Sequence, residues 1–266
     1  MKNGYRLRAA VGLHRGDREQ QQDQVILLRH PYASDCMMGV VADGMGGRTG
    51  GRRASDQVIL TARQLFEHYL PAADDPEDLL RQIAQQAHAL IRLTAVTTEQ
   101  EPHSTFAAFL VNPGGQCVCA HSGDSRIYHF HGSTLIKRTL DHSYVQMLVD
   151  QGHLSEQEAA AHPQSNVLIS CLGMEQEPQL DLHRISRLRA GDSLLACSDG
   201  LWHYFTADEL GMVISSMPPR DASEMLIRQA RQRAMGNGDN LSLAIVRINR
   251  PAPNQIAPGA EFAPLQ

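Results

Sequence analysis

The order of strands and helices along the chain predicts an α+β fold, in which antiparallel sheets are covered by pairs of helices. Runs of strands are followed by runs of helices, whereas a regular alternation of strand and helix would indicate a parallel sheet. Short strands joined by glycine-containing turns, such as Pro113-Gly114-Gly115, favour antiparallel pairing. With 266 residues, the chain can bury a large core as one domain or at most two.

Three strands and two long helices account for the first third of the chain. Alternating residues and short apolar runs predict strands at residues 5–13, 24–28 and 37–42. Apolar residues then recur at helical spacing over residues 51–70. Asp75 and Pro76 open a second helix as its N-cap and first helical residue. Two consecutive amphipathic helices need a sheet, or each other, to cover their apolar faces.

The middle of the chain returns to strands and then holds a small helical insert. Four strands whose lengths suit an antiparallel meander are predicted at residues 105–111, 116–121, 126–130 and 134–138. Ser155 and Glu158 form a capping box ahead of a short helix that stops near Pro163.

The C-terminal part is predicted to hold strands and a second pair of helices. The strands are expected at residues 179–185, 193–198 and 241–248. Thr206 and Glu209 form another capping box, and Asp221 starts a helix that runs to about Met235. We therefore place one domain at residues 1–250. Residues 251–266 contain four prolines and no periodicity, which predicts a disordered tail.

The composition excludes several classes of protein. Apolar residues at 42% and charged residues at 20% are typical of a globular domain, and a net charge of -5 gives no reason to expect nucleic acid as a partner. Five cysteines with irregular spacing form no disulfide framework, and Cys117 and Cys119 at strand spacing favour core packing. We find no signal peptide and no apolar run of transmembrane length. These features predict a cytoplasmic protein without membrane insertion.

Two apolar strands end in the same dipeptide, Asp-Gly. One strand leads into Asp43 and Gly44, and the other leads into Asp199 and Gly200. Gly44 has no Cβ, so its carbonyl can turn toward a ligand that the preceding carboxylate holds. Asp-Gly is above all a turn signal, so a plain turn is the alternative interpretation.

Five acidic residues lie at predicted loop mouths next to strand ends: Asp23, Asp43, Asp124, Asp199 and Asp239. Such carboxylates, several beside glycine, indicate a site for hard cations, because magnesium and manganese prefer oxygen ligands. Two such ions would lower the pKa of a shared water and clamp a phosphoryl group. Each aspartate taken alone is more often a turn residue, and His142 is more often a structural hydrogen-bond partner than a catalyst.

Short motifs follow one another in a defined order along residues 7–248. They are Arg18-x4-Asp23, Asp43-Gly-x-Gly-Gly, Ser122-Gly-Asp-Ser-Arg126, Asp141-His-Ser143, Asn166-Val-Leu168 before Leu172-Gly173, Ser198-Asp-Gly-Leu201 and Asp239-Asn240. This ordered set resembles the metal-dependent Ser/Thr protein phosphatases, the PPM or type-two-C family. The resemblance implies a four-layer α-β-β-α sandwich, with two antiparallel sheets flanked by helix pairs. It also implies a small flap subdomain at about residues 143–166.

The resemblance further implies a centre of two manganese or magnesium ions, with a third ion in many relatives. Asp43 is similar to the carboxylate that bridges the two ions, and the Gly44 carbonyl is similar to a ligand of the second. Asp199 and Asp239 resemble ligands of the first ion.

Three other residues have counterparts around that centre. Asp23 resembles the carboxylate that holds metal-bound water. Arg18 is similar to the arginine that grips the substrate phosphate, which suits its planar fork of donors, although a solvated surface arginine is the alternative. Asp124 resembles the ligand that, with Asp199, holds the third and weaker ion.

The activity implied by the resemblance is hydrolysis of phosphoserine and phosphothreonine in proteins. A metal-bridging hydroxide would attack phosphorus directly, the metals and Arg18 would neutralise the developing charge, and no phosphoenzyme would form. By analogy, the partners are phosphorylated Ser/Thr proteins and a Ser/Thr kinase whose marks the enzyme reverses. The alternatives are a catalytically weak phosphoprotein-binding module and a phosphatase of a small phosphate ester.

The sequence departs from the family pattern in a few positions. Met45 stands where many eukaryotic relatives have a histidine proposed to protonate the leaving group. Metal-bound water, His142 or His203 then remain as candidates for the acid. Ser170-Cys171 replaces an Arg-Ala pair. No departure removes an expected metal ligand, so the sequence predicts an active enzyme.

Overall fold

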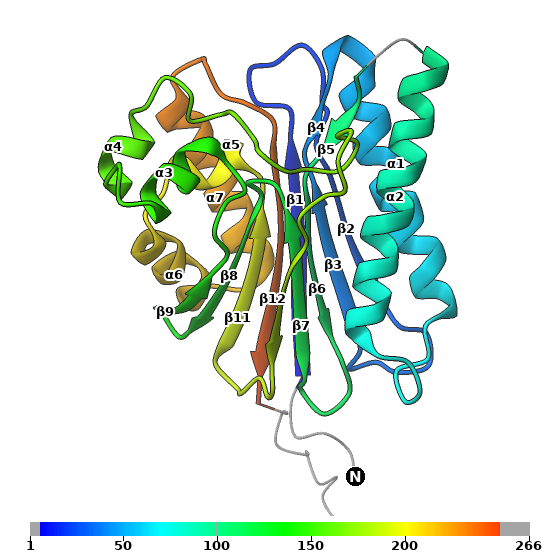
Figure 1. Ribbon diagram of the computed structural model, residues 1–266. Helices are drawn as coiled ribbons and strands as arrows, with labels where there is room; N and C mark the ends of the chain where they lie inside the picture. Colours follow the sequence, from blue (N-terminus) through cyan, green and yellow to red (C-terminus); the bar gives the residue numbers. More distant parts are fainter. Residues whose placement is uncertain (1–5, 99–100, 251–266) are drawn as a thin grey trace, which may run out of the picture.

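The computed structural model describes residues 6–98 and 101–250, and its core consists of two antiparallel five-stranded sheets that face each other (Figure 1). One sheet has the order β1 (Arg6–His14), β12 (Leu241–Asn249), β11 (Asp192–Cys197), β8 (Arg126–His131) and β9 (Thr134–Arg138). The other has the order β10 (Asp181–Ile185), β7 (Cys117–Ser122), β6 (Phe106–Val111), β3 (Met37–Ala42) and β2 (Gln24–Arg29).

A pair of helices covers the outer face of each sheet (Figure 1). Helices α1 (Gly47–His68) and α2 (Pro76–Thr98) pack on the sheet that contains β3. Helices α6 (Ala207–Ser216) and α7 (Pro219–Ala234) pack on the sheet that contains β11. The predicted four-layer sandwich is therefore confirmed. The predicted tail at residues 251–266 lies outside the described residues.

Strands β3 and β11 are buried on both faces, which explains the apolar sequence of β3 and of residues 194–197 in β11. In β3, Val40 packs beneath α1 and α2, and Val41 packs between the sheets. In β11, Leu194 lies between the sheets and Leu195 lies beneath α6 and α7. Successive strand residues point to opposite faces, so each strand contributes to two layers of the core. Each fully buried aliphatic side chain contributes about 1.5–3 kcal/mol to the stability of the fold.

Helix boundaries follow the sequence signals where a cap is present. The capping boxes of Ser155 with Glu158 and of Thr206 with Glu209 are both formed, and they start α4 (Glu156–Ala160) and α6. Helix α7 begins at Pro219, two residues before the predicted Asp221, because proline suits the first helical position. In the described ranges, no helix is both long enough and apolar enough to cross a membrane.

The chain changes sheets between β7 and β8, so the single meander predicted for residues 105–138 is wrong at this point. Strands β6 and β7 pair in one sheet, whereas β8 and β9 pair in the other. Gly123 permits the crossing with a φ of 103°, and a Cβ there would lie 2.8 Å from Thr105 Cγ2. Asp124 therefore lies on the loop that passes from one sheet to the other.

One end of the sandwich gathers the loops that carry the predicted site residues (Figure 1). Strands β3 and β11 end there, immediately before Asp43 and Ser198, and β12 starts there, just after Asn240. A two-stranded ladder of β4 (Gly44–Met45) and β5 (His103–Ser104) lies at the same end. The insert with α3 (Tyr144–Asp150) and α4 lies near this end of the sandwich as well.

Candidate metal centre

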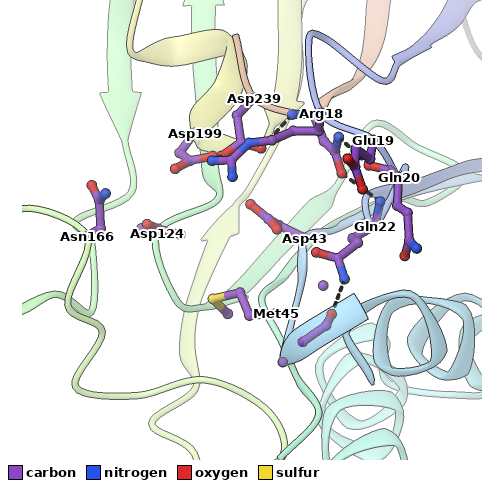
Figure 2. A pocket seen from close by; sticks show the side chains of 14 residues that line it. Arg18, Glu19, Gln20, Gln22, Asp43, Met45, Asp124, Asn166, Asp199 and Asp239 are labelled. Carbon is purple, nitrogen blue, oxygen red and sulfur yellow. Dashed lines mark hydrogen bonds and ion pairs between the residues drawn. The ribbon is translucent and has the colours of Figure 1, made fainter. Parts of the chain in front are cut away.

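Six of the seven predicted site residues line one cleft at this end of the sandwich (Figure 2). They are Arg18, Asp43, Gly44, Asp124, Asp199 and Asp239. The cleft has a volume of about 480 Å³. The seventh residue, Asp23, is buried, with 1% of its surface exposed. Folding thus gathers carboxylates from at least four separate segments of the chain.

Asp43 is held by its main chain at the end of β3. Its N–H donates to Thr105 Oγ1 at 2.9 Å, and its carbonyl accepts from the Thr105 N–H at 2.9 Å. The Thr105 hydroxyl also lies 2.7 Å from Ser125 Oγ. Since Thr105 Oγ1 accepts from Asp43, its own proton is free to bond Ser125. Thr105 therefore joins the Asp43 turn to the loop that carries Asp124.

Gly44 and Gly200 are required because the main chain of another segment passes very close to each of them. A Cβ on Gly44 would collide with the Gly51 carbonyl in α1, and a Cβ on Gly200 would collide with the Asn240 carbonyl. Gly200 lies in the single-turn helix α5 (Asp199–Trp202). Its close approach to Asn240 brings the neighbouring Asp199 and Asp239 to one side of the cleft.

Asp23 ties together the strands that deliver Asp199 and Asp239. Its Oδ2 accepts hydrogen bonds from Ser198 Oγ at 2.6 Å and from Ser242 Oγ at 2.8 Å. Burial raises the pKa of Asp23 to about 7 even though both serine hydroxyls favour the ionised form. A neighbouring positive charge would relieve this cost.

The cleft concentrates negative charge. Burial raises the pKa values of Asp43, Asp124 and Asp199, and repulsion from neighbouring carboxylates raises them further. Among the fourteen described residues that line the cleft, Arg18 is the sole basic one. Its Nη2 pairs with Asp239 Oδ2 at 2.7 Å. Buried carboxylates in excess of cations fit divalent metal ions with oxygen ligands, and the donor set contains neither cysteine nor histidine.

Asn240 holds the loop that carries Arg18, a role that the sequence did not reveal. Its Nδ2 donates to the Arg15 carbonyl at 2.8 Å and to the Gln20 carbonyl at 3.0 Å, and its Oδ1 accepts from the Gln22 N–H at 2.6 Å. These bonds fix the loop that carries Arg18. The one signal in the sequence was its position directly after Asp239.

A second group of candidate ligands, His121, His142 and Asp181, has ligand atoms within 4.8 Å of one another. The Nδ1 of His142 accepts from the Gly123 N–H, so its Nε2 carries a proton and faces Asp181 Oδ2 at 3.3 Å. His121 Nε2 donates to the Leu140 carbonyl. A protonated Nε2 does not bind a metal. Both histidines are thus held by hydrogen bonds to the main chain, which favours the structural interpretation of His142.

The candidates for a proton donor are not equally placed. Met45 lines the cleft, and neither His142 nor His203 is among the described residues that line it. His142 is 4% exposed, its Nδ1 accepts from the Gly123 N–H, and its Nε2 faces Asp181 at 3.3 Å. The side chains on the cleft surface thus supply no histidine as an acid.

A comparison with protein families and a comparison with individual proteins point to the same family. The protein phosphatase 2C family matches residues 13–234. The chain is 32% identical over 228 residues to the protein phosphatase PhpP of Streptococcus pneumoniae, covering 80% of this chain and 86% of PhpP.

Two solved structures share the fold over almost their whole length. PppA, described as a key regulatory component of T6SS in Pseudomonas aeruginosa, superposes with a TM-score of 0.77 at 31% identity, covering 91% of this chain and 98% of PppA. The catalytic domain of the serine/threonine protein phosphatase PstP, in complex with two manganese ions, has a TM-score of 0.75 at 27% identity. That match covers 92% of this chain and 99% of the PstP chain.

Proposed function

The chain belongs to the protein phosphatase 2C family, and on this premise we propose that it is a metal-dependent phosphatase of phosphoserine and phosphothreonine in proteins. The observation that carries the proposal is the convergence of Asp43, Asp124, Asp199 and Asp239 on one cleft, whose described lining includes a single arginine. Such a site binds divalent cations and, through them, a phosphate group.

We assign the cation ligands from the resemblance to the family, and their place in one cleft supports the assignment. Asp43 and the Gly44 carbonyl, with Asp199 and Asp239, would hold a pair of manganese or magnesium ions, and Asp23 would support them from the buried side. Asp124 with Asp199 would hold a third, weaker ion. The manganese pair in PstP supports this choice of metal. When bound, two such cations lower the pKa of the water that attacks phosphorus and neutralise charge on the phosphoryl oxygens.

The protein side chains bind and orient the substrate and do not form a covalent intermediate. All five cysteines are buried, and none lines the cleft, so no thiol is available as a nucleophile. Arg18 is 63% exposed, and a surface ion pair such as its bond to Asp239 is weak. Its guanidinium is therefore free to leave Asp239 and to bind two phosphate oxygens.

By analogy with the family, we also propose the domain bounds, the role of the insert and the location of the enzyme. Residues 1–250 form the catalytic domain, and the insert at about residues 143–166 acts as a flap beside the cleft. The Asn166 side chain lines the cleft, which supports a role of this insert in substrate contact. We place the enzyme in the cytoplasm, where it reverses phosphorylation by a cognate Ser/Thr kinase.

Arg18→Lys is expected to lower kcat/KM by about 10–100-fold, because an ammonium replaces a two-pronged contact with the phosphate. Steady-state kinetics on a phosphothreonine peptide at saturating Mn²⁺ measures this. Arg15→Lys is the matched control, since Arg15 lies on the same loop, is exposed and does not line the cleft. Equal effects of the two variants would argue against a direct role of Arg18.

The substrate class is tested with purified protein and Mn²⁺ on three substrates. These are a phosphothreonine peptide, the same peptide with phosphotyrosine, and a small phosphate ester. We expect kcat/KM to be at least about tenfold higher for phosphothreonine than for phosphotyrosine. Faster turnover of the small ester would indicate a metabolite phosphatase. Peptide binding without turnover would indicate a binding module.

A further inference from the structure

The main chain around Asp124 is held from three sides. The His142 N–H donates to the Gly123 carbonyl at 2.9 Å, and the Ser125 hydroxyl bonds Thr105. The Asp124 carbonyl itself accepts a hydrogen bond from Trp202 Nε1 at 2.9 Å. The Asp124 side chain meanwhile faces the cleft. The indole of Trp202 is thus the side chain that directly fixes the peptide group of Asp124.

Trp202 is itself held in place by a buried ion pair. The guanidinium of Arg126 lies over the indole, with Cζ 3.4 Å from the ring centroid. Its Nε and Nη2 donate to the two carboxylate oxygens of Asp141 at 2.8 and 2.7 Å. The side chains of Arg126 and Asp141 are 14% and 9% exposed. A two-pronged pair at this burial fixes the plane of the guanidinium, and with it the plane of the indole.

The contacts of Trp202 link two carboxylates of the cleft, those of Asp124 and Asp199. Trp202 is the last residue of α5, and Asp199 is the first. One turn of helix and one hydrogen bond therefore separate Asp199 from the Asp124 carbonyl. The Asp43 turn is joined to the same loop by a different route, through Thr105 and Ser125, and Trp202 takes no part in it. The contacts are suited to set the spacing between Asp124 and Asp199.

We propose that Trp202, Arg126 and Asp141 are positioning residues that set the Asp124 carboxylate opposite Asp199 and thereby tune the affinity of the third cation alone. The inference rests on the proposed function, because it uses the assignment of Asp124 and Asp199 to that cation. Supporting contacts of this kind change metal affinity by about 10–100-fold when they are removed.

The test is calorimetric titration of the metal-free protein with Mn²⁺ alone. Trp202→Phe retains an aromatic ring at this position but is smaller than the indole and lacks the donor to Asp124. We expect two tight ions with unchanged Kd and a third whose Kd rises about tenfold. Asp141→Asn, which weakens the pair that holds the guanidinium, is expected to act in the same direction. Thermal unfolding with Mn²⁺ present shows whether each variant is folded.

Tyr128→Phe is the matched control. Tyr128 is buried and its hydroxyl accepts a long hydrogen bond of 3.4 Å from Arg126 Nη1, but it does not touch Asp124. We expect this variant to bind all three ions as the unchanged protein does. An unchanged third Kd in Trp202→Phe would overturn the proposal, and so would an equal weakening of all three ions.

Asp124→Asn separates a failure of this inference from a failure of the proposed function. If that variant loses the third ion while Trp202→Phe does not, the proposed role of the positioning residues is wrong and the assignment of Asp124 stands. If Asp124→Asn binds three ions normally, the assignment of Asp124 is wrong and the inference falls with it.

Discussion

Asp43→Asn is expected to lower kcat by at least about 10³-fold, because the one carboxylate proposed to bridge both cations becomes a neutral amide. The change keeps the shape of the side chain, and the bonds of Thr105 to the Asp43 main chain do not depend on the carboxylate. The turn should therefore keep its position while the cation pair loses its shared ligand. Removal of residues that only support a metal ligand costs about 10–100-fold in metal affinity or activity, so loss of a shared ligand should cost more.

The assay compares Asp43→Asn with the unchanged enzyme in Mn²⁺ and in chelator. Asp208→Asn is the matched control, because Asp208 is exposed in the first turn of α6 and does not line the cleft. We expect the control to remain active and the unchanged enzyme to lose activity in chelator and recover it with Mn²⁺. Full activity in chelator, or in Asp43→Asn, would contradict the proposed mechanism.

The sequence predicted the elements that have a strong local signal. The apolar runs in β3 and β11 and the capping boxes of α4 and α6 are local patterns, and the structure contains all four elements near the predicted bounds. Elements of two to four residues, such as β4 and α5, are too short to show a period. They form because the sandwich brings their partners together.

The site residues were also predictable from local sequence patterns, but their hydrogen-bond partners were not. A carboxylate beside glycine at a strand end is visible in the sequence, and six of the seven predicted residues do line the cleft. The partners that fix them were not visible, because the bonds of Asp23 to Ser198 and Ser242 join residues 175 and 219 positions apart. The change of sheet at Gly123 was missed because a short loop between two strands is usually a hairpin.

The metal-free protein is expected to lose stability as the pH rises. Asp23 has a pKa of about 7 in the folded chain and 3.8 as its ordinary value. Between these values the unfolded chain ionises Asp23 while the folded chain keeps it protonated, so the free energy of unfolding falls as the pH rises. Asp23 alone accounts for at most roughly 4 kcal/mol of this loss, and for less where its neighbours titrate with it. The loss is complete above about pH 7.

Unfolding by denaturant in chelator, at intervals from about pH 5 to 8, measures this loss. Added Mn²⁺ should reverse most of it, because cations that bind only the folded chain stabilise it and favour ionised carboxylates. Asp43→Asn tests the cost of the buried carboxylates in a second way, since burial and four neighbouring aspartates raise the pKa of Asp43. In chelator near pH 8 this inactive variant should be more stable than the unchanged protein by about 1–3 kcal/mol. A lower stability of Asp43→Asn under those conditions would mean that the carboxylates are already compensated without metal.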